Sequence, residues 1–339
     1  MKKKLSLLEI FFYGLLFGVF VTAMVFLFTI KEEGEETVYY HEYNTQTNDP
    51  SIIRIGVLAT RGVTDANARW DETAEYLNVL IPSHTFVIVP LGFDEVNEKV
   101  ENEEVDFILV NSAVYVDLEV NNNVSRIVTL NNLVLGEETT SYGSVIFTKS
   151  DQTDINSYAD LKDATFGAVA STSFGGWQMA QKEFADYNIN PFKDFESIEF
   201  AETDDNVVLR VINGVYDAGT VRTGTIERMV EAGQISLSDI KILRTKSSNF
   251  PLMVSTQLYP EWPIAKASHI SETLGQEVAN ALMQMDETDQ AAIDSSIAGW
   301  TIPQNYEDVH TTLQSLRVDP YEEFGNVSFH DSIFHNRVF

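Results

Sequence analysis

Residues 166–180 read FGAVASTSFGGWQMA, and this stretch decides the fold. The apolar run 166–170 predicts a strand, the hydroxyl residues and glycines that follow predict a tight turn, and Trp177, Ala180 and Phe184 recur at helical spacing. A strand–turn–helix of this kind directs backbone N–H groups and the positive end of a helix dipole to one point, which suits an oxyanion. The same residues also suit an ordinary helix cap, so the turn alone leaves both interpretations open.

The chain on either side repeats this strand–helix alternation. Apolar runs predict strands at 52–58, 86–91, 105–110, 126–135, 142–148, 164–170, 197–200, 218–221, 240–243 and 252–255. Helical patterns lie between them, for example at 66–80 and 205–213, and further helices follow near 271–285 and 306–316. Such alternation predicts mostly parallel sheets covered by helices on both faces. Ligands of these sheets bind beyond the carboxyl ends of the strands.

Polar residues stand at several of these strand ends. Arg61 follows the first strand, Asn111 and Ser112 follow the strand at 105–110, and Arg222 and Thr223 follow the strand at 218–221. An arginine in an acidic chain offers a fork that binds carboxylates and oxyanions with two hydrogen bonds. Arg61 and Arg222 could equally form surface salt bridges, for Arg222 with Glu227 or Asp217 nearby in the sequence.

Three lysines at residues 2–4 precede an apolar run from Leu5 to Ile30 that contains only one charged residue, Glu9. As a helix this run would measure roughly 39 Å at ~1.5 Å per residue, enough to cross a bilayer with tilt. No small-residue cleavage site follows it, so we expect an uncleaved, single-pass anchor in the inner (cytoplasmic) membrane, with residues 1–4 inside the cell and the remainder in the periplasm or outside. Residues 31–50 lack apolar periodicity and are expected to be a tether.

Composition excludes several function classes. The formal charge of −29 repels nucleic acid, so we expect no nucleic-acid partner. There is no cysteine, hence no lipid-modified cysteine, disulfide or thiolate metal site. The six histidines are scattered, and no nucleotide-binding or hydrolase motif is complete. We therefore expect no enzyme activity, no cofactor and no metal.

The residues resemble a known family in seven places. These are IRIGVL at 53–58, the Arg69-Trp70 pair, VDFILVN at 105–111, STSFGG at 171–176, DAGTVRTG at 217–224, YPEWP at 259–263 and Gly299-Trp300. Together they resemble the phosphate/phosphite/phosphonate type of periplasmic solute-binding protein, and within it the sensor domains of tetrathionate-sensor-like histidine kinases. The resemblance covers about residues 52–321, with STSFGG and DAGTVRTG as its most specific parts.

This resemblance implies an α/β, two-lobe periplasmic-binding-protein (type II) fold that closes on a small anion. Residues 51–140 and 248–321 would form the first lobe, residues 141–247 the second, and residues 322–339 a C-terminal tail. The expected ligand-binding residues are Ser171, Thr172, Ser173, Gly175, Arg222, Thr223, Asn111, Ser112, Arg61 and Tyr142.

The resemblance also implies a role in sensing or in import. Because neither a second membrane helix nor a kinase follows in this sequence, we expect a separate membrane partner, a sensor kinase or similar, to read the closed state. The alternative is the binding component of an ABC importer for phosphonates or other oxyanions, whose partner would be the permease. An interaction protein that kept the fold and lost the ligand is a third class.

Overall fold

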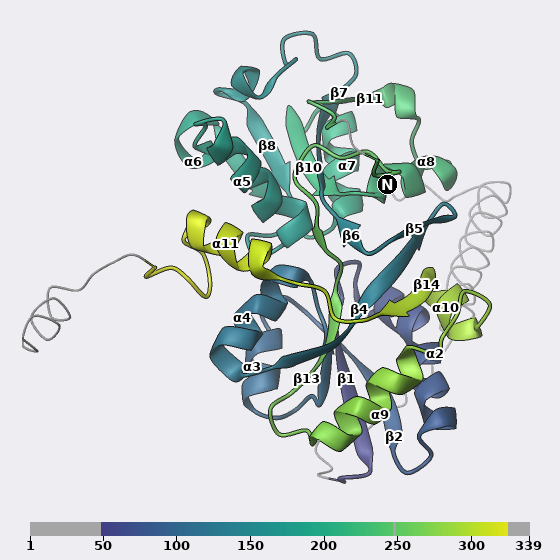
Figure 1. The fold of residues 1–339 in the computed structure, drawn as a ribbon. Helices are drawn as coiled ribbons and strands as arrows, with labels where there is room; N and C mark the ends of the chain where they lie inside the picture. Colours follow the sequence, from purple (N-terminus) through teal and green to yellow (C-terminus); the bar gives the residue numbers. More distant parts are fainter. Residues whose placement is uncertain (1–48, 247–248, 325–339) are drawn as a thin grey trace, which may run out of the picture. The chain divides into compact units, whose positions relative to one another are not determined.

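The computed structural model describes residues 49–246 and 249–324. Two sheets, each flanked by helices, build the two lobes (Figure 1). The predicted membrane anchor, most of the predicted tether and most of the predicted C-terminal tail lie outside the described residues. Within the described part of the chain, no helix combines the length and apolar character needed to span a bilayer.

The first lobe contains a seven-stranded sheet in the order β14-β4-β13-β3-β1-β2, with β5 paired to β4. Its strands are β1 (Ile52–Leu58), β2 (Thr85–Leu91), β3 (Phe107–Leu109), β4 (Ser125–Val134), β5 (Glu137–Thr139), β13 (Pro263–Lys266) and β14 (Ile297–Thr301). The helices that cover it are α2 (Val63–Leu80), α3 (Val96–Glu101), α4 (Ser112–Asn122), α9 (Glu272–Leu282) and α10 (Gln290–Ser295).

The second lobe contains a five-stranded sheet in the order β11-β7-β10-β8-β9. Its strands are β7 (Ser144–Lys149), β8 (Thr165–Ala168), β9 (Ser197–Phe200), β10 (Ala218–Arg222) and β11 (Ile240–Ile242). Its helices are η1 (Tyr158–Leu161), η2 (Phe174–Gln178), α5 (Met179–Asp186), α6 (Pro191–Asp194), α7 (Asp204–Ile212), α8 (Thr225–Glu231) and η3 (Leu237–Asp239).

The prediction of mostly parallel sheets is wrong. In the first lobe β1 pairs in parallel with β2 and β3, but β13, β4, β14 and β5 join antiparallel. In the second lobe β8 pairs in parallel with β9 and β10, while β7 joins β10 and β11 antiparallel. Both sheets are therefore mixed, with parallel and antiparallel pairs in each.

The predicted strand at 252–255 is also absent. Ser255 instead uses its side chain and backbone to pair with the second sheet: Ile146 N donates to Ser255 Oγ at 3.0 Å, and Ser255 N donates to Ser144 O at 2.8 Å. These contacts give Ser255 hydrogen-bond partners in the second sheet without the regular backbone hydrogen bonds of a β-strand. The pair Gly299-Trp300 lies in β14.

The chain crosses between the lobes at β6 (Ser141–Tyr142) and returns at β12 (Tyr259–Pro260). These two short strands pair antiparallel, with Tyr142 opposite Tyr259. A final helix, α11 (Glu307–Leu316), then packs against α4 of the first lobe and α5 of the second (Figure 1). The crossing strands and α11 are therefore where the two lobes are joined.

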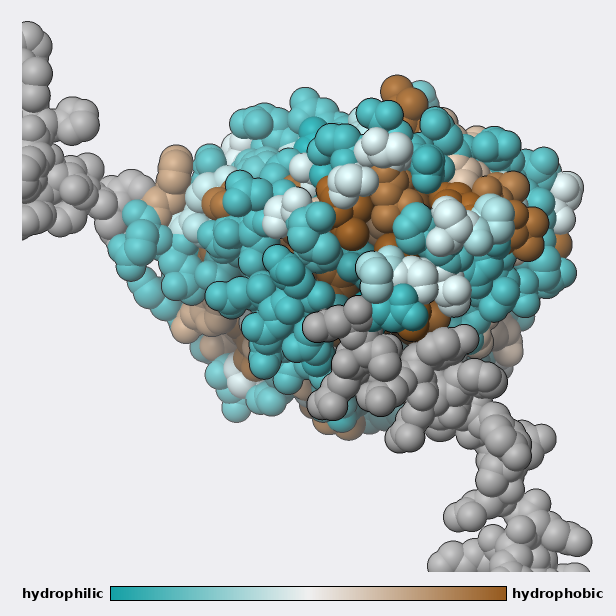
Figure 2. Space-filling model, turned by 90° about the horizontal axis from the view of Figure 1, so that it is seen from below, coloured by the Kyte–Doolittle hydropathy of each residue, from teal (hydrophilic) through white to brown (hydrophobic). Residues whose placement is uncertain are grey.

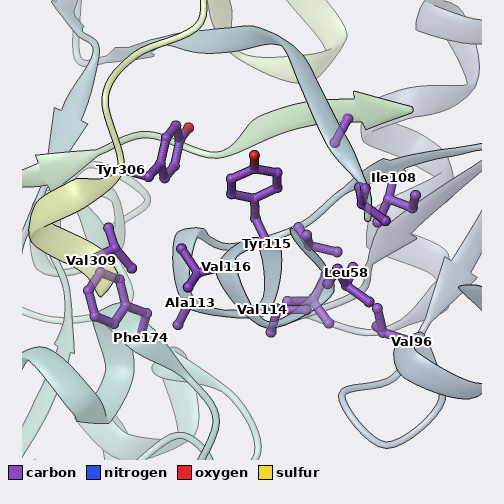
Figure 3. Close-up of a cluster of buried hydrophobic side chains, with 14 of the residues drawn as sticks. Leu58, Val96, Ile108, Ala113, Val114, Tyr115, Val116, Phe174, Tyr306 and Val309 are labelled. Atoms are coloured by element: carbon purple, nitrogen blue, oxygen red, sulfur yellow. The ribbon is translucent and has the colours of Figure 1, made fainter. Parts of the chain in front are cut away.

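One buried core reaches across this junction. Phe174 of η2 lies beside Ala113 and Val116 of α4 and Val309 of α11, as Figure 3 shows. Phe174 and Val309 are both fully buried. Burial of aromatic and aliphatic side chains from both lobes in a single cluster stabilises their attachment to each other.

The face seen from below Figure 1 is mostly hydrophilic, and its hydrophobic residues are more frequent toward the upper right of the view (Figure 2). Several large apolar side chains are well exposed, Val79 at 77 % and Ile293 at 55 % among them. Scattered apolar residues of this kind are normal on soluble domains and do not by themselves mark a site.

Candidate ligand-binding cavity

A cavity of about 260 Å³ lies between residues of both lobes. Its first-lobe wall comes from the turn after β1, from α2, from β4 and its following turn, and from Trp262. Its second-lobe wall comes from the end of β10, from α7 and from α8. The cavity thus lies at the carboxyl ends of β1 and β10, where the strand pattern predicted a ligand site.

Four arginines line this cavity: Arg61, Arg69, Arg222 and Arg228. Arg61 follows β1, Arg69 is on α2, Arg222 ends β10 and Arg228 is on α8. Each comes from a different element, so only the fold brings them together. Four guanidinium groups around one cavity offer many hydrogen-bond donors for an anion.

Three of the predicted site residues line the cavity. Arg61, Arg222 and Thr223 do so, and Thr223 also accepts a hydrogen bond from Gly143 N at 3.2 Å through Oγ1, which ties the end of β10 to the lobe crossing.

The other seven predicted residues are not among those that line the cavity as described. Ser171 and Thr172 are exposed, and Ser173 is buried and accepts a hydrogen bond from Gly176 N at 3.2 Å as a helix cap. Asn111 caps α4, accepting from Ala113 N and Val114 N at 3.0 Å each. In this arrangement Ser173 and Asn111 cap helices, and a binding role for either remains a prediction.

Ser112, Tyr142 and Gly175 lie together at the lobe junction. Ser112 Oγ donates to Pro260 O at 2.6 Å and is 3.3 Å from Tyr142 Oη. Burial raises the pKa of Tyr142 to about 12, so its hydroxyl is neutral at physiological pH. Of these residues, Tyr142 contacts Arg222 directly: the Arg222 guanidinium lies 4.4 Å from the centre of the Tyr142 ring.

Arg222 forms an ion pair that the sequence did not indicate. Its Nη2 donates to Oε1 of Glu261, 39 residues away, rather than to Glu227 or Asp217. Glu227 instead accepts from Met253 N, and Asp217 from Thr165 N. Burial raises the pKa of Glu261, while the adjacent Arg222 charge opposes that rise.

Arg69 is, with Arg228, one of two cavity arginines that sequence reasoning missed. Its Nη2 donates to Ser295 O at 2.9 Å, and its guanidinium lies 5.2 Å from the centre of the Trp70 ring. Burial, with the nearby Arg61 charge, lowers the pKa of Arg69 to about 10, which still leaves it charged at neutral pH. The sequence signal that could have found Arg69 is the Arg69-Trp70 pair. Trp70 lies on the buried face of the amphipathic helix α2, and Arg69 is the residue directly before it.

Two carboxylates, Asp204 and Glu231, also line the cavity, and much of the remaining wall is apolar and aromatic. Trp70, Leu130, Leu133, Val134 and Trp262 line it. Within the described chain, the indole Nε1 of Trp262 is buried and has no acceptor. The arrangement of charged forks beside aromatic faces can bind and orient a small anion, and among the described residues no cluster of acidic or histidine side chains could hold a metal ion.

Comparison with known proteins bears on the fold described above. The family model described as "ABC transporter, phosphonate, periplasmic substrate-binding protein" matches residues 55–323. The tetrathionate sensor histidine kinase of Salmonella typhimurium is 28 % identical over 269 residues, which are 79 % of this chain and 44 % of the kinase. The chain therefore spans less than half the length of this relative.

Solved structures of similar fold include PhnD1 from Prochlorococcus marinus in complex with methylphosphonate. It has a TM-score of 0.65 at 12 % identity, covering 79 % of this chain and 99 % of PhnD1. A binding-protein component of an ABC phosphonate transporter from Pseudomonas aeruginosa has a TM-score of 0.64 at 14 % identity, covering 84 % and 92 % of the two chains. These likenesses confirm the two-lobe α/β fold.

Proposed function

Because the chain belongs to the family of phosphonate-type periplasmic substrate-binding proteins, we propose that it binds a small anion in the cavity between its two lobes. The family is one of binding proteins and not of enzymes, in agreement with the expectation from sequence. The observation that carries the proposal is the position of Arg69: it lines the cavity, and no carboxylate of the described chain pairs with it.

The proposed binding residues are Arg69 and Trp262 together with Arg61, Arg222 and Thr223. Arg69 would hold the anionic group, because an arginine fork forms charge-assisted hydrogen bonds of about twice the strength of neutral ones. Ser171, Thr172, Ser173, Gly175, Asn111, Ser112 and Tyr142 remain proposals as ligand contacts. A change in the angle between the lobes could bring some of them to the ligand.

We propose further that ligand binding is sensory. The similarity to a tetrathionate sensor histidine kinase supports this role. The apolar run 5–30 would anchor the chain in the cytoplasmic membrane with the lobes outside, and a separate membrane protein, a sensor kinase or similar, would read the closed state.

Helix α11 offers a route from the cavity to such a partner. It contacts α4 and α5, one from each lobe, so a change in lobe angle must change its packing. Tyr306, which precedes α11, donates a hydrogen bond through Oη to the backbone carbonyl of Glu261, and Thr312 of α11 lies 2.9 Å from Tyr259 Oη. Both contacts link α11 to the segment that carries the partner of Arg222.

The alternative is the substrate-binding component of an ABC importer, whose partner would be the permease. The description of the family and the methylphosphonate complex of PhnD1 favour it. Both roles require the same anion site. They differ in which membrane protein recognises the closed, ligand-bound form.

The test of anion binding is thermal unfolding of the purified chain with phosphate, methylphosphonate, sulfate, thiosulfate, tetrathionate and small carboxylates. A ligand present at 100 times its Kd stabilises the folded state by ~2.7 kcal/mol, a readily measured increase in Tm. We expect a selective increase with one class of anion. No increase with any of them would contradict the proposal.

The test of role is photo-crosslinking from exposed positions of α11, such as Thr311 and Ser315, in native membranes. A ligand-dependent crosslink to a kinase is the result that the sensory proposal predicts. A crosslink to a permease would support the importer instead.

A further inference from the structure

One turn at the edge of the cavity has a backbone conformation that does not suit its residue. Strands β4 and β5 pair antiparallel as far as Val134 and Glu137, so Leu135 and Gly136 form a two-residue hairpin turn. The φ angle is 53° at Leu135 and 80° at Gly136. Turns with positive φ at both positions usually contain Asn-Gly, Asp-Gly or Gly-Gly, because a larger side chain is strained there.

Leu135 stands apart from the other residues of this conformation. Of the non-glycine residues with positive φ in the described ranges 49–246 and 249–324, it is the one with an apolar side chain. The side chains of Asn and Asp tolerate this conformation because they can form local hydrogen bonds, and the side chain of leucine cannot. A strained residue of this kind points to a function of its side chain.

The side chain of Leu135 lies at the mouth of the cavity. Leu135 lines the cavity and is also 48 % exposed. A residue that faces both the cavity and the solvent lies where the two meet. Leu133 and Val134, directly before the turn, also line the cavity and are half-buried. The hairpin of β4 and β5 therefore forms one rim of the opening.

The opposite rim belongs to the second lobe. Gly224, directly before α8, lines the cavity, and a Cβ atom at this glycine would lie 3.2 Å from Val134 Cγ1 and 3.5 Å from Val134 Cγ2. Figure 1 shows the hairpin of β4 and β5 extending from the first sheet toward α8. Because Gly224 has no side chain, Val134 can approach its backbone, and the hairpin reaches the second lobe.

The hairpin is joined directly to the lobe crossing. Thr140 alone separates β5 from β6, and Thr140 O accepts a hydrogen bond from Glu261 N at 2.9 Å. Val134 belongs to the first sheet and Gly224 follows a strand of the second, so a change in the angle between the lobes must change their separation. Access through this rim therefore depends on the lobe angle.

From these contacts we propose that the β4–β5 hairpin is a lid of the cavity: Val134 closes it against Gly224, and Leu135 covers the mouth and limits the passage of ligand. The inference rests on the proposed function and adds how a ligand enters and leaves the site. A leucine is useful at this strained position because glycine, which suits the turn, would leave the mouth open.

The experiment measures access to the cavity in the absence of any ligand. Of the four tryptophans of the chain, Trp70, Trp177 and Trp300 are buried, whereas Trp262 in the cavity wall is half-buried. Quenching of tryptophan fluorescence by acrylamide, an uncharged molecule, therefore reports mainly on Trp262 in the purified full chain. The measured quantity is the Stern–Volmer quenching constant.

The deciding variant is Leu135→Gly, which removes the side chain and suits the positive φ of the turn. We expect a higher quenching constant than in the unmodified chain, with no decrease in the urea concentration at the midpoint of unfolding. Leu135→Met keeps a long apolar side chain and should keep the quenching constant of the unmodified chain.

Glu103→Gly is the matched control. Glu103 is exposed, has a φ angle of 57° and is not among the residues that line the cavity as described. This variant removes a side chain from the same backbone conformation elsewhere, so it should leave the quenching constant unchanged.

A second variant, Val134→Ala, tests the contact across the lobes. It shortens the side chain that faces Gly224, so we expect it to raise the quenching constant as well. An unchanged constant in Leu135→Gly or in Val134→Ala, or an equal increase in Glu103→Gly, would overturn the lid. A lower unfolding midpoint in Leu135→Gly would also overturn it, because the leucine would then have a structural role.

The outcomes separate this inference from the proposed function, because no anion takes part in the quenching experiment. An increase in Tm with one class of anion, together with unchanged quenching in the two lid variants, would overturn the lid and leave the anion site standing. Failure of every anion to raise the Tm would overturn the proposed function, whatever the quenching constants are.

Discussion

Gly175 lies directly against the ring of Tyr142: a Cβ atom at Gly175 would be 2.9 Å from Tyr142 Cε2 and 3.3 Å from Arg222 Cβ. Because Gly175 has no Cβ atom, η2 can lie close to Tyr142 and Arg222. Ser144 Oγ fixes this approach by donating to Gly175 O at 2.6 Å.

We predict that Gly175→Ala destabilises the fold and weakens anion binding together. The added methyl group must displace Tyr142 or the start of the Arg222 side chain, and overpacking of this kind costs about 1–3 kcal/mol. Urea unfolding and ligand titration on the same protein measure both effects. An alanine variant with unchanged stability would mean that the contact is looser than described.

Ser171→Ala should have little effect on stability, within about 0.5 kcal/mol, because the side chain is exposed and forms no described hydrogen bond. It should also leave anion affinity unchanged if the cavity as described is the site. A clear loss of affinity in this variant would restore the interpretation of the turn as the cradle of the ligand.

Tyr306→Phe should destabilise the chain by about 1–3 kcal/mol, because it leaves the buried carbonyl of Glu261 without the Tyr306 hydroxyl as donor. Tyr187→Phe is the matched control, since Tyr187 is 39 % exposed and its hydroxyl forms no described hydrogen bond. Chemical unfolding compares the two. Equal stability of both variants would argue against the coupling of α11 to the Glu261 segment.

Asp117 should make stability depend on pH. Burial raises the pKa of Asp117 above its ordinary value of 3.8, although Asn97 and Asn121 donate to its carboxylate. A raised pKa means that its contribution is fully present below pH 3.8 and is lost as pH rises through the folded value. Asp117→Asn does not titrate, so the variant should gain stability relative to the unmodified chain as pH rises.

Asp286→Asn is the control of opposite sign. The hydrogen bonds from the side chain and backbone of Thr288 lower the pKa of Asp286, so the unmodified chain should gain relative to this variant as pH rises. Urea unfolding at several pH values from 3 upward measures both slopes. Parallel slopes for the two variants would contradict the assignment.

Much of the fold is predictable from local pattern. The strands at 52–58 and 197–200 form over the predicted residues, because apolar periodicity reports which face of a segment is buried. Whether a strand runs parallel or antiparallel to its neighbours depends on the path of the whole chain and not on the local sequence. The mixed sheets were therefore not predicted. Ser255 shows the same limit. Its hydroxyl oxygen accepts a hydrogen bond from Ile146 N in the second sheet, a contact that exists only in the folded chain.

The strand-end pattern found part of the cavity lining, but Asn111 and Ser112 also follow a strand and do not line the cavity. Arg61, Arg222 and Thr223 follow strands and line the cavity. Arg69 lies beside buried Trp70 on α2, and helical spacing alone does not separate an arginine at the edge of the buried face from one in solvent. Glu261 is the partner of Arg222 because β12 returns beside β6, a pairing of segments more than a hundred residues apart.

The most direct test of the account is the anion affinity of Arg69→Gln, measured by isothermal titration beside Lys193→Gln, an exposed position on α6 that loses the same charge. The account predicts that Kd rises by about 10-fold or more in Arg69→Gln, since a hydrogen bond to a charged group contributes ~1.5–3 kcal/mol, and that it stays unchanged in Lys193→Gln. Equal affinity in the two variants would contradict an anion site in this cavity.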